Sequence, residues 1–229
     1  QHQGSNSEAA QRYEDSLQSA KKLFKNNYVV AQIAYTFANF LWENQQPPDY
    51  TRAEKLYVSA KTMYTNTYDA GHAWVQTILC KLSDMYETMD DIDNAALCLR
   101  TYLDESQTLL SNTSLATFQY YLGRLYTIQK DIDNAKAYLL QALSYRREHQ
   151  SNKPHLISNT LWYLYKCAYQ ESDISQLFLY LEEALQLRMK SSKSFSAYNT
   201  FKIASTLCER YLEFDRLESL LELLTSMQV

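Results

Sequence analysis

One five-residue sequence occurs twice in this chain, and the distance between its copies constrains the fold more than any other feature. Asp91-Ile92-Asp93-Asn94-Ala95 is repeated letter for letter as Asp131-Ile132-Asp133-Asn134-Ala135, 40 residues later. Self-similarity at a period of roughly 20 to 50 residues is typical of proteins that stack one supersecondary unit many times. The chain of 229 residues is therefore predicted to be a repeat array, which grows linearly as units are added.

A second pattern extends the repeat over the whole chain. A small or apolar residue, followed by apolar residues four and seven places later, occurs six times in register. Positions i, i+4 and i+7 share one face of a helix, so each triplet is predicted to be a buried stripe on the second helix of a unit. The first members are 40, 42, 40, 42 and 40 residues apart. The triplets are Tyr13/Leu17/Ala20, Ala53/Tyr57/Ala60, Ala95/Leu99/Tyr102, Ala135/Leu139/Ala142, Leu177/Leu181/Ala184 and Leu217/Leu221/Leu224.

The predicted fold class is all-α, with five antiparallel helix pairs that follow an unpaired first helix. Only three Gly and three Pro occur, which argues against a turn-rich β fold and for long helices. An Asp stands just before four of the second helices, where a carboxylate can cap the helix: Asp91, Asp131, Asp173 and Asp215. The eleven predicted helices cover, to within a few residues, 7–25, 28–45, 50–65, 70–88, 92–108, 113–129, 132–148, 154–170, 174–190, 195–212 and 215–228.

The repeat pattern predicts a single domain over residues 8–229, after a polar and disordered lead at residues 1–7. The first helix has no partner before it, and the apolar stretch Leu217–Leu224 has no polar capping helix after it. Terminal repeats need a covered outer face. We therefore expect a fragment of a longer array or a first helix that serves as a cap, and self-association through the terminal helices would also cover these faces.

The repeated residues resemble the tetratricopeptide repeat (TPR) family. That family places a large apolar residue, a small residue and a Tyr in the first helix of a unit, and Ala, Leu and Ala in the second. Leu122, Gly123, Tyr126, Ala135, Leu139 and Ala142 match position by position. The period of 40 to 42 is similar to that of kinesin light chain, LGN/Pins-type adaptors, bacterial Rap-type regulators and the helical arrays of separase and cohesin-loader assemblies. Two helix ends, Ala142-Leu143-Ser144-Tyr145-Arg146 and Ala184-Leu185-Gln186-Leu187-Arg188, resemble the AL-x-x-R ends of kinesin-light-chain repeats.

The resemblance implies an α–α superhelix whose first helices line a concave partner-binding groove. An aromatic and basic part of that groove would hold acidic groups of a partner by aromatic anchors and charge-assisted hydrogen bonds. The plainer alternative is an ordinary solvated inner face with packing aromatics. The residues expected to face the groove are Tyr35, Asn39, Trp42, Asp84, Tyr120, Arg124, Trp162, Lys166, Tyr169 and Lys202.

Composition excludes several classes of function. The net charge is −4 and no basic stripe occurs, so direct nucleic-acid binding is not expected. No apolar run is long enough to span a membrane. The four His are scattered, and three Gly cannot build a phosphate-binding loop, so we expect no metal, no cofactor and no catalytic site. The four Cys are widely spaced and lie in apolar stretches, which predicts buried, reduced thiols in a cytoplasmic or nuclear protein.

The function predicted from these features is a non-catalytic scaffold that binds a protein segment, as a subunit of a larger assembly. Two alternatives stay open at this point. One is a regulatory array that senses a short peptide, as the Rap class does. The other is a helical accessory domain of a larger enzyme such as a separase-type protease.

Overall fold

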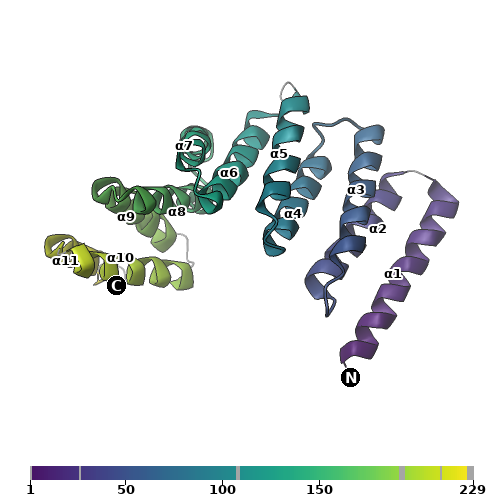
Figure 1. Cartoon of the computed structure of the whole chain (residues 1–229), viewed down its shortest axis with the longest axis horizontal. Coiled ribbons are helices and arrows are strands. Elements are labelled where there is room, and N and C mark those ends of the chain that lie inside the picture. The colour runs from purple at the N-terminus through teal and green to yellow at the C-terminus, as the bar shows by residue number, and fades with distance from the viewer. Residues whose placement is uncertain (1, 26, 107–108, 191–193, 212, 226–229) are drawn as a thin grey trace. The chain divides into compact units, whose positions relative to one another are not determined.

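The structure is a computed structural model that describes residues 2–25, 27–106, 109–190, 194–211 and 213–225. This part of the chain is helical and contains no strand. Successive helices run antiparallel and are joined by short turns (Figure 1). The elements are α1 (His2–Phe24), α2 (Tyr28–Asn39), the π-helix η1 (Phe40–Asn44), α3 (Tyr50–Thr67), α4 (Ala73–Thr88), α5 (Ile92–Ser106), α6 (Asn112–Gln129), α7 (Ile132–His149), α8 (Pro154–Glu171), α9 (Ile174–Lys190), α10 (Ser194–Tyr211) and α11 (Phe214–Thr225).

The chain divides into two compact units, unit 1 (Gln1–Phe118) and unit 2 (Gln119–Val229), and the boundary falls within α6. In unit 1, α2 packs against α1 and α3, and α4 packs against α3 and α5. In unit 2, α8 packs against α7 and α9, and α10 packs against α9 and α11. The predicted packing of each helix against the next is therefore confirmed within each unit. The prediction of one repeat domain over residues 8–229 stays a prediction.

Each predicted helix has a counterpart, and the differences lie at the ends. Helix α1 begins at His2, five residues before the expected start. The end of the second predicted helix is a π-helix, in which the Gln45 N–H donates to the Phe40 carbonyl at 2.9 Å, five residues back. The predicted helix ends at residues 108, 212 and 228 lie outside the described residues.

The duplicated sequence forms the same cap in both places. Oδ1 of Asp131 accepts from the Asn134 backbone N–H at 3.3 Å, and Oδ2 accepts from the Asn134 side-chain amide at 2.8 Å. Asp91 makes the same two contacts with Asn94, at the same two distances. Each cap satisfies a backbone N–H that the first turn of a helix leaves without a partner. The predicted capping role of both Asp residues is confirmed.

The residue before each of these Asp residues adopts a left-handed backbone conformation that ends the preceding helix. Lys130 has φ of 63° and Asp90 has φ of 60°. Ser172, at the corresponding place in the next repeat, has φ of 58°, and Asp173 after it accepts from the Gln176 N–H at 3.1 Å. Asp215 was also expected to precede its helix, but it lies inside the first turn of α11 because that helix already begins at Phe214.

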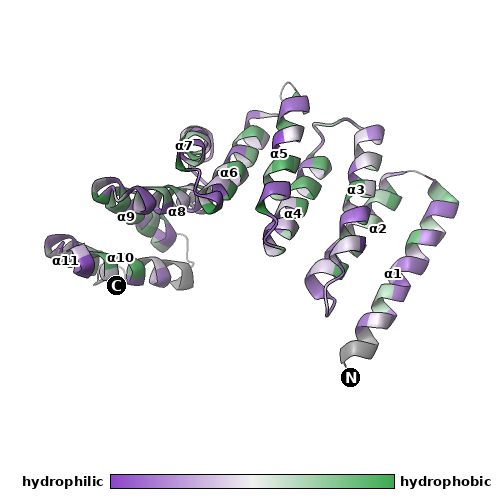
Figure 2. Cartoon of the chain, viewed as in Figure 1, coloured by the Kyte–Doolittle hydropathy of each residue, from purple (hydrophilic) through white to green (hydrophobic). Residues whose placement is uncertain are grey.

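The predicted stripes of α3, α5, α7 and α9 are buried, and none of their residues is more than 6% exposed. Hydrophobic and hydrophilic residues alternate along the helices (Figure 2). The α11 stripe was predicted to be buried as well, but Leu221 is 47% exposed, because the packing of α11 against α10 leaves Leu221 uncovered. The side chain of Leu224 lies outside the described part of the chain.

The crossing of α6 and α7 is close, as the small residue in the pattern predicts. A Cβ atom on Gly123 would lie 2.5 Å from Cγ of Leu139 and 3.1 Å from the carbonyl oxygen of Ala135. Leu139 itself is fully buried among the side chains of α7 and α8. The absence of a side chain at Gly123 therefore allows the two helices to approach.

Candidate binding surfaces

Four of the ten predicted groove residues lie in unit 1 and six in unit 2, so each set is described within its own unit. In unit 1, the Tyr35 ring lies 6.0 Å from the Tyr57 ring and 5.4 Å from the Trp74 ring. The Tyr57 hydroxyl donates a hydrogen bond to the Asn39 side chain, and burial raises the pKa of Tyr57 well above its usual value. Tyr35 and Asn39 are half-buried, and both support the packing of neighbouring helices.

Trp42 and Asp84 border an ion pair that the sequence analysis did not single out. The Lys81 ammonium lies 2.6 Å from a Glu43 carboxylate oxygen and 5.3 Å from the centre of the Trp42 ring. Burial acts to lower the pKa of Lys81, but the hydrogen bond and charge of Glu43, together with the charge of Asp84, raise it. The charges here are paired within the chain, which leaves less net charge for a partner.

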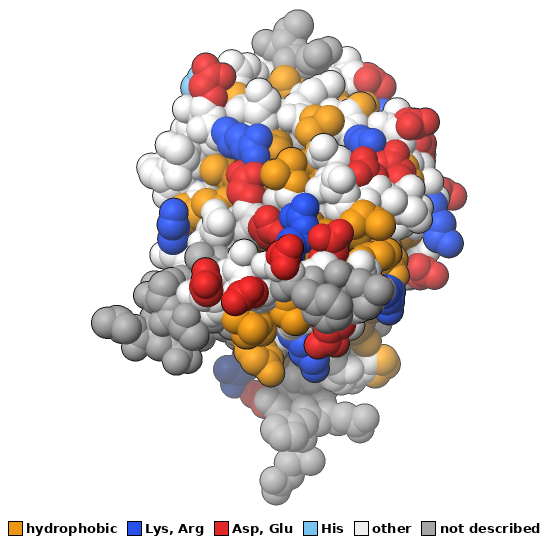
Figure 3. Space-filling view, turned by 90° about the vertical axis from the view of Figure 1, so that its left-hand side faces the viewer, with side chains coloured by type: hydrophobic (Ala, Val, Ile, Leu, Met, Phe, Trp, Pro, Cys, Tyr) orange, Lys and Arg blue, Asp and Glu red, His pale blue; other side chains and the backbone are white. Residues whose placement is uncertain are grey.

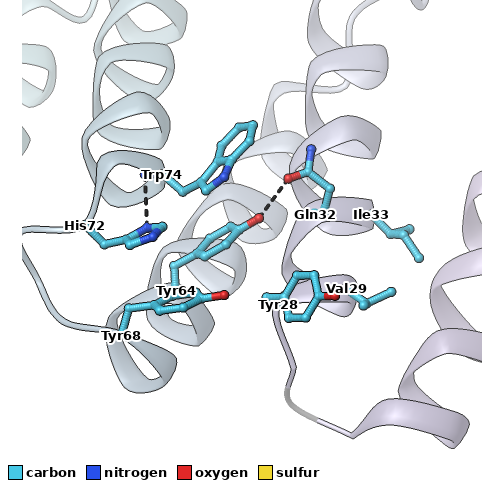
Figure 4. Close-up of a pocket in the computed structure, with 8 residues that line it drawn as sticks. All are labelled: Tyr28, Val29, Gln32, Ile33, Tyr64, Tyr68, His72 and Trp74. Carbon is cyan, nitrogen blue, oxygen red and sulfur yellow. Dashed lines mark hydrogen bonds between the residues drawn. The ribbon is translucent and has the colours of Figure 1, made fainter.

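A second feature of unit 1 is an aromatic pocket of about 500 Å³. The first turns of α2 form one wall with Tyr28, Val29, Gln32 and Ile33 (Figure 4). The end of α3 and the turn into α4 form the other wall with Tyr64, Tyr68, His72 and Trp74. We call these eight residues the aromatic pocket. Its volume lies in the range of about 300–1,000 Å³ that is typical of ligand sites.

The rings of the second wall are nearly parallel. Tyr68 and His72 stack at 4.2 Å, Tyr64 and Trp74 at 5.8 Å, and the planes of each pair differ by 10° and 14°. The Tyr64 hydroxyl donates to Oε1 of Gln32 at 2.8 Å, which joins the two walls. Burial raises the pKa of Tyr64 to about 12, so its hydroxyl is neutral at physiological pH.

In unit 2, tyrosines and cations alternate on α6 and α8. Arg124 lies 4.7 Å above the Tyr121 ring, and Lys166 lies 4.8 Å above the Tyr163 ring. The two pairs are 42 residues apart and occupy equivalent positions on the first helices of neighbouring pairs. Tyr120 connects them, because its ring contacts both Tyr121 at 5.7 Å and Tyr163 at 5.9 Å. We call these five residues the Tyr–cation face.

Beneath this face lies an arginine that sequence analysis noted only as part of a family-like helix end. Arg146 is 2% exposed, and its guanidinium lies 4.5 Å from the centre of the Tyr120 ring. Its Nη1 donates to the Leu156 carbonyl at 3.0 Å and to the Thr160 hydroxyl at 2.7 Å. Burial lowers the pKa of Arg146 to about 10, against the opposing effect of Tyr120. Through these hydrogen bonds, Arg146 joins the end of α7 to the start of α8.

The next helix pair of unit 2 repeats this arrangement 40 to 42 residues later. Arg188 of α9 lies 4.8 Å from the centre of the Trp162 ring and donates to the hydroxyl of the fully buried Thr200 in α10. Burial also lowers the pKa of Arg188. Trp162, predicted to face the groove, thus stacks on a structural arginine. The arginine of the AL-x-x-R end was visible in the sequence, but its partner in the next helix was not.

The remaining two predicted groove residues are Tyr169, near the end of α8, and Lys202, on α10. Tyr169 is 41% exposed, and its hydroxyl accepts from Nη1 of Arg210 at 2.9 Å. Lys202 is exposed. Unit 2 therefore brings Tyr120, Arg124 and Lys166 into one contiguous face, whereas no described contact joins Lys202 to that face.

Other site classes find little support among the described residues. On the face drawn in Figure 3, side chains of both charge signs are interspersed with hydrophobic ones. No group of three or more His, Cys, Asp or Glu is placed to hold a metal ion in the described part of the chain. No helix there is long and apolar enough to cross a membrane. All four Cys are free thiols, but Cys80 and Cys98 are only half-buried, whereas burial was expected for all of them.

The comparisons with known proteins agree with the repeat. Residues 116–149 match the model of the tetratricopeptide repeat family, and this segment contains the six residues that fit the family pattern best. No curated protein sequence matches the chain significantly.

Two solved structures have a similar fold. BtubC (BKLC) from P. vanneervenii superposes with a TM-score of 0.78 at 16% identity, over 97% of this chain and 91% of that one. A putative kinesin light chain from Podosopora anserina, with nearly identical TPR-like repeats, superposes with a TM-score of 0.59 at 15% identity, over 86% of this chain and 92% of that one. The chain is thus an all-α solenoid of TPR-like helix pairs that contains a tetratricopeptide repeat at residues 116–149.

Proposed function

We propose that this chain is a non-catalytic protein-interaction scaffold, and that its partner docks an acidic segment on the Tyr–cation face of unit 2. Support for the general role comes from the TPR-like fold, which presents side chains of adjacent helices as an extended surface. The four free thiols fit a reducing compartment, so we also propose a cytoplasmic or nuclear location.

The observation that carries the proposal is the repetition of the Tyr–cation pair on adjacent helices. Each pair combines a ring that can bury apolar area with a partly exposed cation that can bind a carboxylate. Tyr and Arg are also the residue types that dominate the binding energy of protein interfaces. Among the described residues, Lys166 makes no ion pair, so its charge is available to a partner.

Reversing both charges tests the proposal. We expect Arg124→Glu with Lys166→Glu to weaken partner binding by about 100-fold or more, because like charges brought together at an interface cost several kcal/mol. The measurement is affinity purification from the native cell with wild-type and variant chains as bait, followed by mass spectrometry and titration of the recovered partner.

The matched control is Lys21→Glu with Lys22→Glu, which changes the net charge equally at two exposed positions of α1. Because Arg124 is half-buried, Lys166→Glu alone serves as a milder variant, and we expect it to weaken binding by about tenfold. Partners that bind wild type, the double variant and the control equally would show that the Tyr–cation face is not the binding site.

A further inference from the structure

The aromatic pocket of unit 1 offers a binding site that is separate from the Tyr–cation face. It is reachable from solvent, because Tyr28 is 51% exposed and Tyr68 is 49% exposed. None of its eight lining residues is a Lys, Arg, Asp or Glu. Aromatic rings attract cations because the ring face carries partial negative charge, and Trp and Tyr are the strongest such partners.

Elsewhere in the chain, comparable aromatic rings contact arginine side chains. Arg146 and Arg188 both stand four residues after the last Ala of a buried stripe, and both stack on an aromatic ring of a first helix. In the register of α3 that place is taken by Tyr64, four residues after Ala60. The pocket borders Tyr64, and no cation among the described residues lies over a pocket ring. At this register position α3 therefore carries a tyrosine where α7 and α9 carry an arginine, and the pocket beside it has aromatic walls.

The charge of unit 1 favours a cationic occupant. Residues 1–118 contain nine Lys and Arg against fourteen Asp and Glu, whereas residues 119–229 contain thirteen against twelve. Unit 1 therefore has a net charge of −5, and Asp69 is an exposed carboxylate in the turn between Tyr68 and His72. A basic segment would be attracted to this unit, and the aromatic pocket would then receive its side chain.

We propose that the aromatic pocket binds an arginine side chain from a basic segment of a partner protein. A guanidinium is planar, so it can lie parallel to the nearly parallel rings of Tyr64, His72 and Trp74, as Lys cannot. It is also more weakly hydrated than an ammonium, which lowers the cost of entering an apolar pocket. The Tyr64 hydroxyl is held by Gln32, and its oxygen keeps a lone pair that can accept a guanidinium N–H.

The test is a methyl-NMR titration of the full chain with four blocked peptides of Gly and Ser, each with one central residue. That residue is Arg, Lys, Phe or citrulline, which has the shape of Arg without its charge. The methyl groups of Val29 and Ile33 report on the pocket, and Ile132 reports on unit 2. We expect saturable shifts at Val29 and Ile33 with the Arg peptide, and about fivefold weaker binding of the other three, in line with the usual strength of cation–π contacts.

Two variants complete the test. Tyr28→Ala should weaken binding of the Arg peptide by about fivefold, and this half-exposed residue can be removed without disturbing the core. Tyr198→Ala removes a tyrosine that is 62% exposed in unit 2, and it should change nothing. The Arg124→Glu/Lys166→Glu variant should bind the Arg peptide as wild type does, so failure here is distinct from failure of the proposed function.

Several results would overturn the assignment. Absence of saturable shifts at Ile33 would show that the pocket does not bind arginine. Equal binding of the citrulline or Phe peptide would make it a slot for neutral groups, and equal binding of the Lys peptide would reduce it to simple charge attraction. Undiminished binding by Tyr28→Ala would place the peptide elsewhere.

Discussion

Replacing Gly123 with Leu is expected to destabilise unit 2 by about 1–3 kcal/mol or more, the usual cost of overpacking a tight core. The first added atom, Cβ, would already lie 2.5 Å from Cγ of Leu139, and the Ala135 carbonyl oxygen lies 3.1 Å away. Leu139 is fully buried, so it cannot move aside into solvent. The gain in helix propensity on replacing Gly, about 1 kcal/mol, opposes this cost but does not cancel it.

Thermal unfolding followed by circular dichroism measures the effect, at roughly 2–4 °C per kcal/mol for a chain of this size. Ala137→Leu is the matched control, because Ala137 is exposed on α7, and its midpoint should stay close to that of wild type. A double-mutant cycle of Gly123→Ala with Leu139→Ala should show that the first change costs less once the Leu side chain is gone. An unchanged midpoint for Gly123→Leu would contradict the close crossing of α6 and α7.

Replacing Arg146 with Ala is expected to cost about 3–5 kcal/mol, as the loss of a large buried side chain with its polar contacts usually does. The change removes hydrogen bonds to the Leu156 carbonyl and the Thr160 hydroxyl, and it leaves a void under Tyr120. Urea unfolding monitored by circular dichroism gives the difference. Arg100→Ala, at an exposed position of α5, is the control and should cost less than about 0.5 kcal/mol.

Arg146→Met separates the packing role of this residue from its charge. Burial penalises the guanidinium charge, which is why the pKa of Arg146 is lowered, and no carboxylate among the described residues compensates it. An apolar side chain of similar length fills the space without that penalty, so Arg146→Met should lose much less stability than Arg146→Ala. Equal losses in both variants would show that the hydrogen bonds, rather than the filled space, hold α7 to α8.

Much of the fold was predictable because its causes are local in sequence. The buried stripe Ala135/Leu139/Ala142 follows from helical spacing alone, and the cap at Asp131 follows from the preference of a helix start for a carboxylate. Both features recur at a fixed period, so the same pattern in several repeats strengthened each prediction. The exposed Leu221 was harder to predict, because burial depends on what packs against the helix as well as on its own pattern.

The site residues were less predictable because their roles depend on neighbours about 40 residues away. The spacing placed Arg124 and Lys166 on equivalent helices, but it could not show that each lies over a tyrosine three residues earlier. Trp162 was predicted to face a partner, and the spacing could not show that it also stacks on Arg188 of the following helix. The aromatic pocket was not predicted, because residues from three separate segments form it, including the turn between Tyr68 and His72.

Hydroxyl-radical footprinting, of the chain alone and in complex with the partner recovered by affinity purification, tests whether the partner binds the Tyr–cation face. Tyrosine side chains react readily, and the 20 tyrosines of this chain supply internal controls. We expect reduced oxidation of Tyr121 and Tyr163 in the complex, with Tyr145 of α7 and Tyr180 of α9 unchanged. Protection of Tyr145 and Tyr180, with Tyr121 and Tyr163 as reactive as in the free chain, would contradict binding at the Tyr–cation face.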